Sequence, residues 1–176
     1  MANIIVSIYT EMTPNPETMK FVANKLLYPG KSIDFTEINQ TEPSPLAEAL
    51  FGFPYVKGVF IASNFVTITK SSDALWEEII PSIRQFLKQY LEEGKQVIIE
   101  ELVPIKKEEQ IVISDDDKDV VTRIKEMLEN YVKPAVEMDG GAISFRGYND
   151  GIVKLMLQGS CSGCPSSMVT LKSGIE

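Results

Sequence analysis

The sequence contains no histidine and only two cysteines among its 176 residues. Without imidazole the chain cannot build a histidine-assisted nucleophile, a histidine-ligated zinc hydrolase site or a histidine-ligated haem site. Positive charge is also scarce, and the formal net charge is -8. A general nucleic-acid binder needs a cationic surface, so we expect no nucleic-acid partner.

Long apolar runs and sorting signals are absent as well. No stretch approaches the roughly 18 apolar residues of a membrane span, so we expect no membrane partner. The segment Met1–Ile8 lacks the positive region that opens a signal peptide, and no arginine-rich transit peptide is present. Two close cysteines are no disulfide framework, and in a reducing cytosol such a pair favours metal binding or redox chemistry. We therefore predict a cytoplasmic location.

The hydrophobic content and the residue pattern of the chain predict an α/β (α+β) fold of two small mixed domains. Hydrophobic residues make up 44% of the chain, which is typical of a globular protein with a buried core. We place the first domain at residues 1–95 and a charged linker at residues 96–116. The second domain takes residues 117–176.

Hydrophobic spacing and turn residues predict the elements of the first domain. Ser44 before Pro45 is typical of a helix start, with Ser44 as the cap. Ser72 or Asp73 is expected to cap a long helix that Gly94 closes, with a kink or a broken start at Pro81. The full predicted order is a strand at Ile4–Tyr9, a helix at Glu17–Leu27, a strand at Ser32–Ile38, a helix at Ser44–Phe51, hairpin strands at Val56–Ala62 and Phe65–Thr69, and the long helix.

The second domain is predicted to begin with a helix at the acidic run Asp115–Asp117, where the helix dipole favours negative charge. Its apolar face is made by Val120, Val121, Ile124, Leu128 and Val132. Pro134 is expected to end this helix. Asp139-Gly140-Gly141 is predicted to be a turn, followed by hairpin strands at Ala142–Tyr148 and Ile152–Leu157.

Both cysteines lie in the loop that follows this hairpin, Gly159-Ser160-Cys161-Ser162-Gly163-Cys164-Pro165. Pro165 suits the first position of a helix, so Cys164 is expected at the helix N-terminus, which would lower the pKa of its thiol. Ser162 and Gly163 are small enough for backbone amides to approach a bound inorganic cluster. Gly159 and Gly163 also permit a positive φ in a tight ligand loop.

Spacing alone leaves several uses of this pair open. Cys161 and Cys164 could be small buried hydrophobic residues, an adventitious disulfide or a thioredoxin-like redox pair. A zinc site of four cysteines, two from each of two chains, would fit the same spacing. Any centre that needs four thiolates must take the other two from a second copy, a partner or a small thiol.

Two groups of residues resemble a known family. The second domain is similar to the C-terminal domain of NifU, the Nfu-type iron–sulfur scaffold, through Asp139-Gly140-Gly141, the run from Gln158 to Ser167 and the run from Thr170 to Glu176. The first domain resembles the N-terminal domain of Nfu scaffold proteins through the runs Thr13 to Phe21, Ser44 to Ala47, Leu50-Phe51 and Phe65 to Lys70.

The resemblance implies a scaffold or carrier, not an enzyme. It implies an iron–sulfur cluster, typically 4Fe–4S with 2Fe–2S as the alternative, bound by Cys161 and Cys164 of two subunits. Such a protein is a homodimer when loaded, works with upstream cluster assembly proteins and hands the cluster to apo-proteins. The competing hypotheses are a thiol–disulfide oxidoreductase that uses the same pair, and an interaction module whose zinc site only fixes a dimer.

Overall fold

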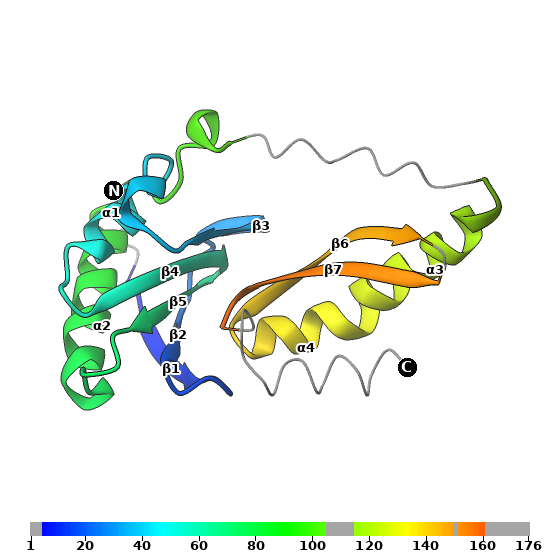
Figure 1. Cartoon of the computed structure of the whole chain (residues 1–176). Coiled ribbons are helices and arrows are strands. Elements are labelled where there is room, and N and C mark those ends of the chain that lie inside the picture. The colour runs from blue at the N-terminus through cyan, green and yellow to red at the C-terminus, as the bar shows by residue number, and fades with distance from the viewer. Residues whose placement is uncertain (1–4, 105–114, 150, 161–176) are drawn as a thin grey trace.

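The computed structural model describes residues 5–104, 115–149 and 151–160. It has an N-terminal unit, residues 5–104, and a C-terminal unit, residues 115–149 and 151–160 (Figure 1). Each unit contains helices and antiparallel strands, so the predicted mixed α/β fold class is confirmed. No described helix is both long enough and apolar enough to cross a bilayer.

The N-terminal unit is built on a five-stranded antiparallel sheet of order β1-β2-β5-β4-β3. Its elements are β1 (Ile8–Met12), β2 (Thr18–Ala23), β3 (Tyr28–Phe35), η1 (Ile38–Gln40), α1 (Pro45–Phe51), β4 (Val56–Ser63), β5 (Phe65–Lys70), α2 (Trp76–Glu92) and η2 (Glu100–Leu102). The predicted hairpin of β4 and β5 and the predicted helix α1 are confirmed. β3 starts and ends earlier than the predicted strand, and β1 starts later.

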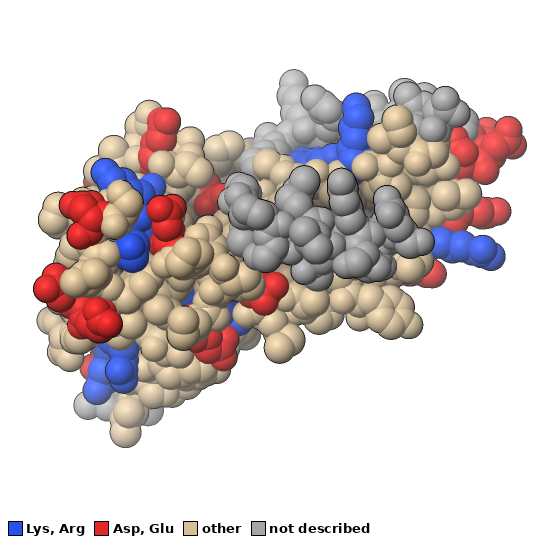
Figure 2. Space-filling model, turned by 60° about the horizontal axis from the view of Figure 1, so that its bottom comes forward, with Lys and Arg blue, Asp and Glu red and all other residues tan. Residues whose placement is uncertain are grey.

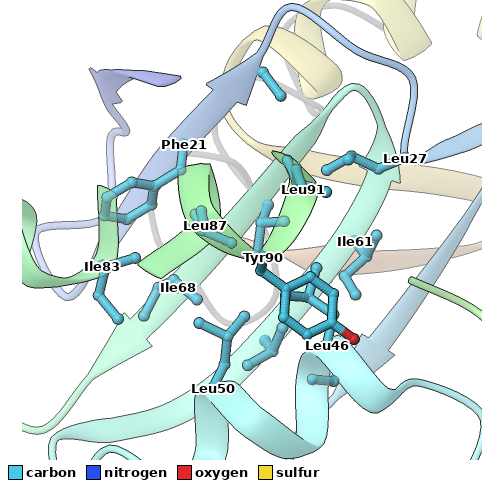
Figure 3. Packing of buried hydrophobic residues seen from close by; sticks show 14 of the residues in the cluster. Phe21, Leu27, Leu46, Leu50, Ile61, Ile68, Ile83, Leu87, Tyr90 and Leu91 are labelled. Atoms are coloured by element: carbon cyan, nitrogen blue, oxygen red, sulfur yellow. The ribbon is translucent and has the colours of Figure 1, made fainter. Parts of the chain in front are cut away.

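The main core lies between one face of this sheet and the two helices α1 and α2 (Figure 3). Strand residues one apart point to opposite faces, so alternate residues of each strand meet the helices. The largest of these buried side chains include Phe21, Phe35, Leu46, Leu50, Ile61, Ile68, Ile79, Ile83 and Leu87.

α2 begins later than predicted. Its N-cap is Leu75, with no side-chain cap hydrogen bond, so neither Ser72 nor Asp73 caps it. The helix is continuous through Pro81, where we expected a kink or a broken start. Pro81 removes one backbone donor near the start of the helix, and its acceptor would be the carbonyl of the exposed residue Glu77.

The predicted helix at Glu17–Leu27 is wrong, because this segment forms β2. All six residues of β2 are buried, and the strand lies between β1 and β5. A strand that is buried on both faces lacks the polar-apolar alternation of a half-buried strand. Its apolar residues therefore matched helical spacing by chance.

The segment after α2 packs against the N-terminal unit. Ile98 is buried in the main core, and the amide of Ile99 donates to the carbonyl of Pro43 at 2.7 Å. Lys31 of β3 forms an exposed ion pair with Glu100 at 2.8 Å. These contacts lie within residues 96–116, our predicted linker, whose residues 105–114 are outside the described ranges. The domain limits remain a prediction.

One long helical segment opens the C-terminal unit. It runs through η3 (Asp115–Asp117), α3 (Lys118–Met127), the π-helical turn η4 (Leu128–Val132) and α4 (Lys133–Met138). The prediction that Pro134 ends the helix is wrong. A π turn widens the helix just before Pro134, so the chain continues although the proline has no amide donor.

The predicted hairpin follows as β6 (Gly141–Asn149) and β7 (Ile152–Gly159). It packs on the helical segment through a small core of Leu128, Val136 and Ile143. Asp139 is the C-cap residue of α4 and Gly140 follows it, so Asp139-Gly140-Gly141 joins helix to strand as predicted.

Candidate functional site

The predicted site residues Cys161 and Cys164 lie outside the described residues, as does the helix predicted from Pro165. The structure describes the end of the hairpin that leads to them. β7 ends at Gly159, and Ser160 directly precedes Cys161.

The end of β7 is fixed against the turn that precedes β6. Ser160 is buried, and its hydroxyl donates a hydrogen bond to the carbonyl of Asp139. The amide of Ser160 donates to the carbonyl of Gly140 at 3.4 Å. Hydrogen bonds therefore join two segments that the family resemblance singled out, Asp139-Gly140-Gly141 and Gly159-Ser160.

Glycine is required at two places in these joined segments. Gly140 and Gly159 have φ values of +80° and +68°, in the left-handed region that favours glycine. A Cβ on Gly159 would also lie 2.8 Å from the carbonyl oxygen of Gly140. The predicted positive φ at Gly159 is confirmed.

The turn before β6 and the end of β7 contact the sheet of the N-terminal unit (Figure 1). The hydroxyl of Thr67 in β5 donates to the carbonyl of Gly140 at 2.8 Å, in a buried position. The amide of Gly159 donates to the carboxylate of Asp34 in β3 at 3.4 Å. Sequence reasoning missed Thr67 and Asp34, because nothing local to either residue indicates a partner so far along the chain.

The contact lies on the face of the sheet turned away from α1 and α2, which we call the helix-free face. Its buried side chains are Thr18, Lys20 and Val22 of β2, Phe60 and Ala62 of β4, and Phe65 and Thr67 of β5. Ala142 of β6 packs against the four apolar ones. Lys20 pairs with Glu11 at 3.2 Å and lies 4.5 Å from the centre of the Phe65 ring.

Charged side chains of both signs are mixed on the face of the N-terminal unit that Figure 2 shows. Figure 2 shows Lys and Arg interspersed with Asp and Glu there, while acidic side chains gather at the far end of the C-terminal unit. On this face the described residues form no continuous cationic area. Within the described ranges, no group of three or more Asp or Glu side chains could hold a metal ion.

The fold and the cysteine pair thus define a protein of two mixed α/β units, with a thiol pair directly after the hairpin of the second. Residues 8–94 match the family model of the scaffold protein Nfu/NifU N-terminal domain. Residues 124–176 match that of the NifU-like domain. The chain belongs to the Nfu/NifU family of scaffold proteins.

Named relatives agree with this assignment. "NifU-like protein 4, mitochondrial" of Arabidopsis thaliana is 42% identical over 171 residues, covering 96% of this chain and 60% of the relative. "NFU1 iron-sulfur cluster scaffold homolog, mitochondrial" of Drosophila sechellia is 42% identical over 170 residues, covering 96% and 59%. The chain thus spans about three fifths of the length of these relatives.

A solved structure is also similar. The solution structure of a NifU-like protein from Saccharomyces cerevisiae matches with a TM-score of 0.50 and 32% identity. The match covers 56% of this chain and 89% of the yeast chain.

The relatives correct one prediction. Both of the relatives described above are named as mitochondrial proteins, and so is "NifU-like protein 5, mitochondrial" of Arabidopsis thaliana. These names point to the mitochondrion, and the predicted cytoplasmic location is wrong. The absence of an arginine-rich segment near Met1 was too weak a basis for that prediction.

Proposed function

We propose that this chain is a non-enzymatic scaffold or carrier of iron–sulfur clusters. It holds a cluster, 4Fe–4S in preference to 2Fe–2S, between Cys161 and Cys164 of two chains and delivers it to apo-proteins. One observation carries the proposal: the match to the NifU-like domain, residues 124–176, includes the only two cysteines in the chain.

The number of thiols sets the oligomeric state. A cluster held by four thiolates needs two chains, because each chain supplies two. The apo-protein is therefore expected to be a monomer, and cluster loading should produce a homodimer. A cluster shared between two loops can also leave more easily than one enclosed in a single chain, which suits transfer to a client.

The test is anaerobic reconstitution with iron and sulfide, followed by metal analysis and native mass spectrometry. One four-iron cluster per two chains corresponds to about two iron and two sulfide per chain, in a brown dimer. One intact four-iron cluster on a single chain without an added thiol would refute the shared site. Zinc in place of iron would favour an interaction module, and a colourless protein with reversible thiol exchange would favour the oxidoreductase.

Single substitutions test the ligands. Cys161→Ser and Cys164→Ser should each abolish stable cluster binding and leave the circular dichroism spectrum unchanged, because both units have hydrophobic cores that need no metal. Ser162→Ala is the matched control, since it alters the same loop without removing a thiol. Stoichiometric iron in either cysteine variant would contradict the assignment.

We also propose that the N-terminal unit recognises partners and binds no cluster. It contains no cysteine and no histidine, and carboxylates and hydroxyls are poor ligands for a cluster. A chain that lacks residues 1–94 should still assemble a cluster but deliver it to a client more slowly. Unchanged transfer to every client tested would show that this unit has no role in recognition.

A further inference from the structure

The helix-free face is more buried than its position in the N-terminal unit explains. Among the described residues, helices α1 and α2 cover only the opposite face of the sheet, yet Phe60 and Thr67 are each 1% exposed and Phe65 is 3% exposed. The turn before β6 and the end of β7 approach this face, and Ala142 packs on it. The C-terminal unit is therefore a partner of this face.

The two surfaces match in shape and polarity. On the helix-free face, the buried hydroxyl of Thr67 donates a hydrogen bond to the carbonyl of Gly140 at 2.8 Å. A Cβ on Gly140 would lie 2.9 Å from the Thr67 hydroxyl, and one on Gly159 would lie 3.0 Å from the Phe60 ring. The two glycines thus let the backbone of one unit reach the side chains of the other.

The end of β7, which contacts the helix-free face, is followed directly in the sequence by the loop that holds the two cysteines. Ser160 is 2% exposed in this arrangement and is directly followed by Cys161. Under the proposed function, a second chain must bring its own cysteine pair to this same end of the C-terminal unit. The segment that contacts the helix-free face and the site that a second chain must reach are therefore neighbours in the sequence.

We propose that the helix-free face is an intramolecular latch, which docks the C-terminal unit of its own chain and must release it before two chains share a cluster. This inference rests on the proposed function. Docking and cluster loading then weaken one another to the same degree, because coupling between two binding events is reciprocal. Among the described residues, the polar part of the contact includes one hydrogen bond of 2.8 Å and one of 3.4 Å, and we take this contact to open and reclose as a latch does.

The test uses the full chain with substitutions that open the latch without disturbing the main core. Thr67→Glu removes the donor and places a carboxylate against the Gly140 carbonyl, while Lys20, directly opposite on β2, can pair with the new charge. Ala62→Lys brings a charge into the apolar part of the same contact. Thr69→Glu is the matched control, two residues further along the same face of β5 and beside Gly58.

Two quantities are measured: the radius of gyration of each apo-protein by small-angle scattering, and the rate of cluster formation with iron and sulfide. Thr67→Glu and Ala62→Lys should be more extended than wild type and form the cluster about five-fold faster, with the same final iron per chain. Thr69→Glu should match wild type in both. Circular dichroism verifies that each variant is folded, and either opening variant alone decides the outcome.

Three results would overturn the latch. The first is a wild-type chain that is already as extended as the opening variants. The second is a variant that opens but loads at the wild-type rate or more slowly. The third is failure of every form, wild type included, to take up a cluster: the proposed function then falls and the latch with it, although scattering would still report whether the units dock.

Discussion

Ser44 connects two parts of the N-terminal unit with one hydroxyl. Its oxygen accepts a hydrogen bond from the amide of Ala47 at 3.1 Å and caps α1. The same hydroxyl donates to the carbonyl of Val97 at 2.7 Å. The cap could be predicted from Ser44-Pro45, but the Val97 contact could not, because hydrogen bonds to distant carbonyls leave no local pattern.

Removing this hydroxyl should destabilise the protein. Ser44→Ala loses the cap and leaves the Val97 carbonyl without this donor, so we expect a loss of about 2 kcal/mol in the free energy of unfolding. Urea unfolding followed by the fluorescence of Trp76, the single tryptophan, measures it. Ser72→Ala, at an exposed serine that caps no helix, should stay within about 0.5 kcal/mol of wild type. Equal losses in the two variants would contradict the role of Ser44.

Tyr90 makes the free energy of unfolding of the protein depend on pH in the alkaline range. Burial raises the pKa of its phenol above the ordinary value of 10.0, and its hydroxyl donates to the carbonyl of Gln96 at 2.8 Å. A raised pKa means that the folded state holds the proton more tightly than the unfolded state. The stabilisation is therefore complete below the unfolded pKa and is lost as pH rises through the folded pKa.

Tyr90→Phe tests this, because phenylalanine has no phenolic proton. The variant should be less stable by about 1 kcal/mol near neutral pH, since the hydrogen bond to Gln96 is lost. Its stability should fall less steeply than that of wild type as the pH rises above about 10. Urea unfolding over this pH range compares the slopes, and parallel slopes would contradict the prediction.

Among the elements, β2 shows why a local pattern failed. Met19, Phe21 and Ala23 belong to the main core, whereas Lys20 and Val22 are on the helix-free face. All six residues of β2 are buried, and Val22 belongs to the cluster on which Ala142 of the C-terminal unit packs. Part of the burial that made the helix prediction fail thus comes from a second unit, which no window around β2 contains.

The π turn η4 keeps one apolar stripe along the helical segment of the C-terminal unit. Leu128 and Val136, eight positions apart, would lie about 80° apart on a regular α-helix. The extra residue of a π turn takes up about 100°, which returns Val136 to the side of Leu128. Both are buried against Ile143 of β6. The sequence predicted the inward positions Val121 and Leu128 but not the π turn, and Val120 of the predicted face is exposed.

Deleting one exposed residue of this turn should therefore be tolerated. Deletion of Glu129 together with Pro134→Ala converts the π turn to regular α-helix and keeps the stripe aligned, so stability should stay within about 1 kcal/mol of Pro134→Ala alone. Deletion of the exposed residue Arg123 in the same background is the control. It rotates Val121 by about 100° relative to Leu128 and should lose the burial of Val121, about 2 kcal/mol. Thermal unfolding compares the variants, and equal losses would contradict the alignment.

At the scale of the whole molecule, the sequence predicted what depends on short motifs. The family match, the two mixed units, the β4–β5 and β6–β7 hairpins and the turn at Asp139-Gly140-Gly141 all follow from local residues. The contact between units could not be predicted. Thr67 and Gly140 lie 73 positions apart, and a threonine or a glycine alone carries no sign of its partner.

The C-terminal limit of the N-terminal unit is another feature that short motifs did not predict. Our predicted boundary at residue 95 falls before a segment that this unit buries. Ile98 lies in the main core, Ile99 donates to Pro43, and Tyr90 donates to Gln96. A fragment that stops at Gly94 loses all of these contacts together with the Ser44–Val97 hydrogen bond. A fragment that extends to Pro104 keeps them.

We therefore predict that fragments 1–94 and 1–104 both unfold cooperatively and bind no iron, but differ in stability. Burial of an isoleucine and these three hydrogen bonds should make fragment 1–104 more stable by about 3 kcal/mol. Because both fragments expose the same helix-free face, loss of the C-terminal unit cancels in the comparison. Ile98→Ala in fragment 1–104 should remove at least half of the gain, since truncating a buried isoleucine creates a cavity. Urea unfolding followed by Trp76 fluorescence gives the three free energies, and equal stability of the two fragments would return the boundary to residue 95.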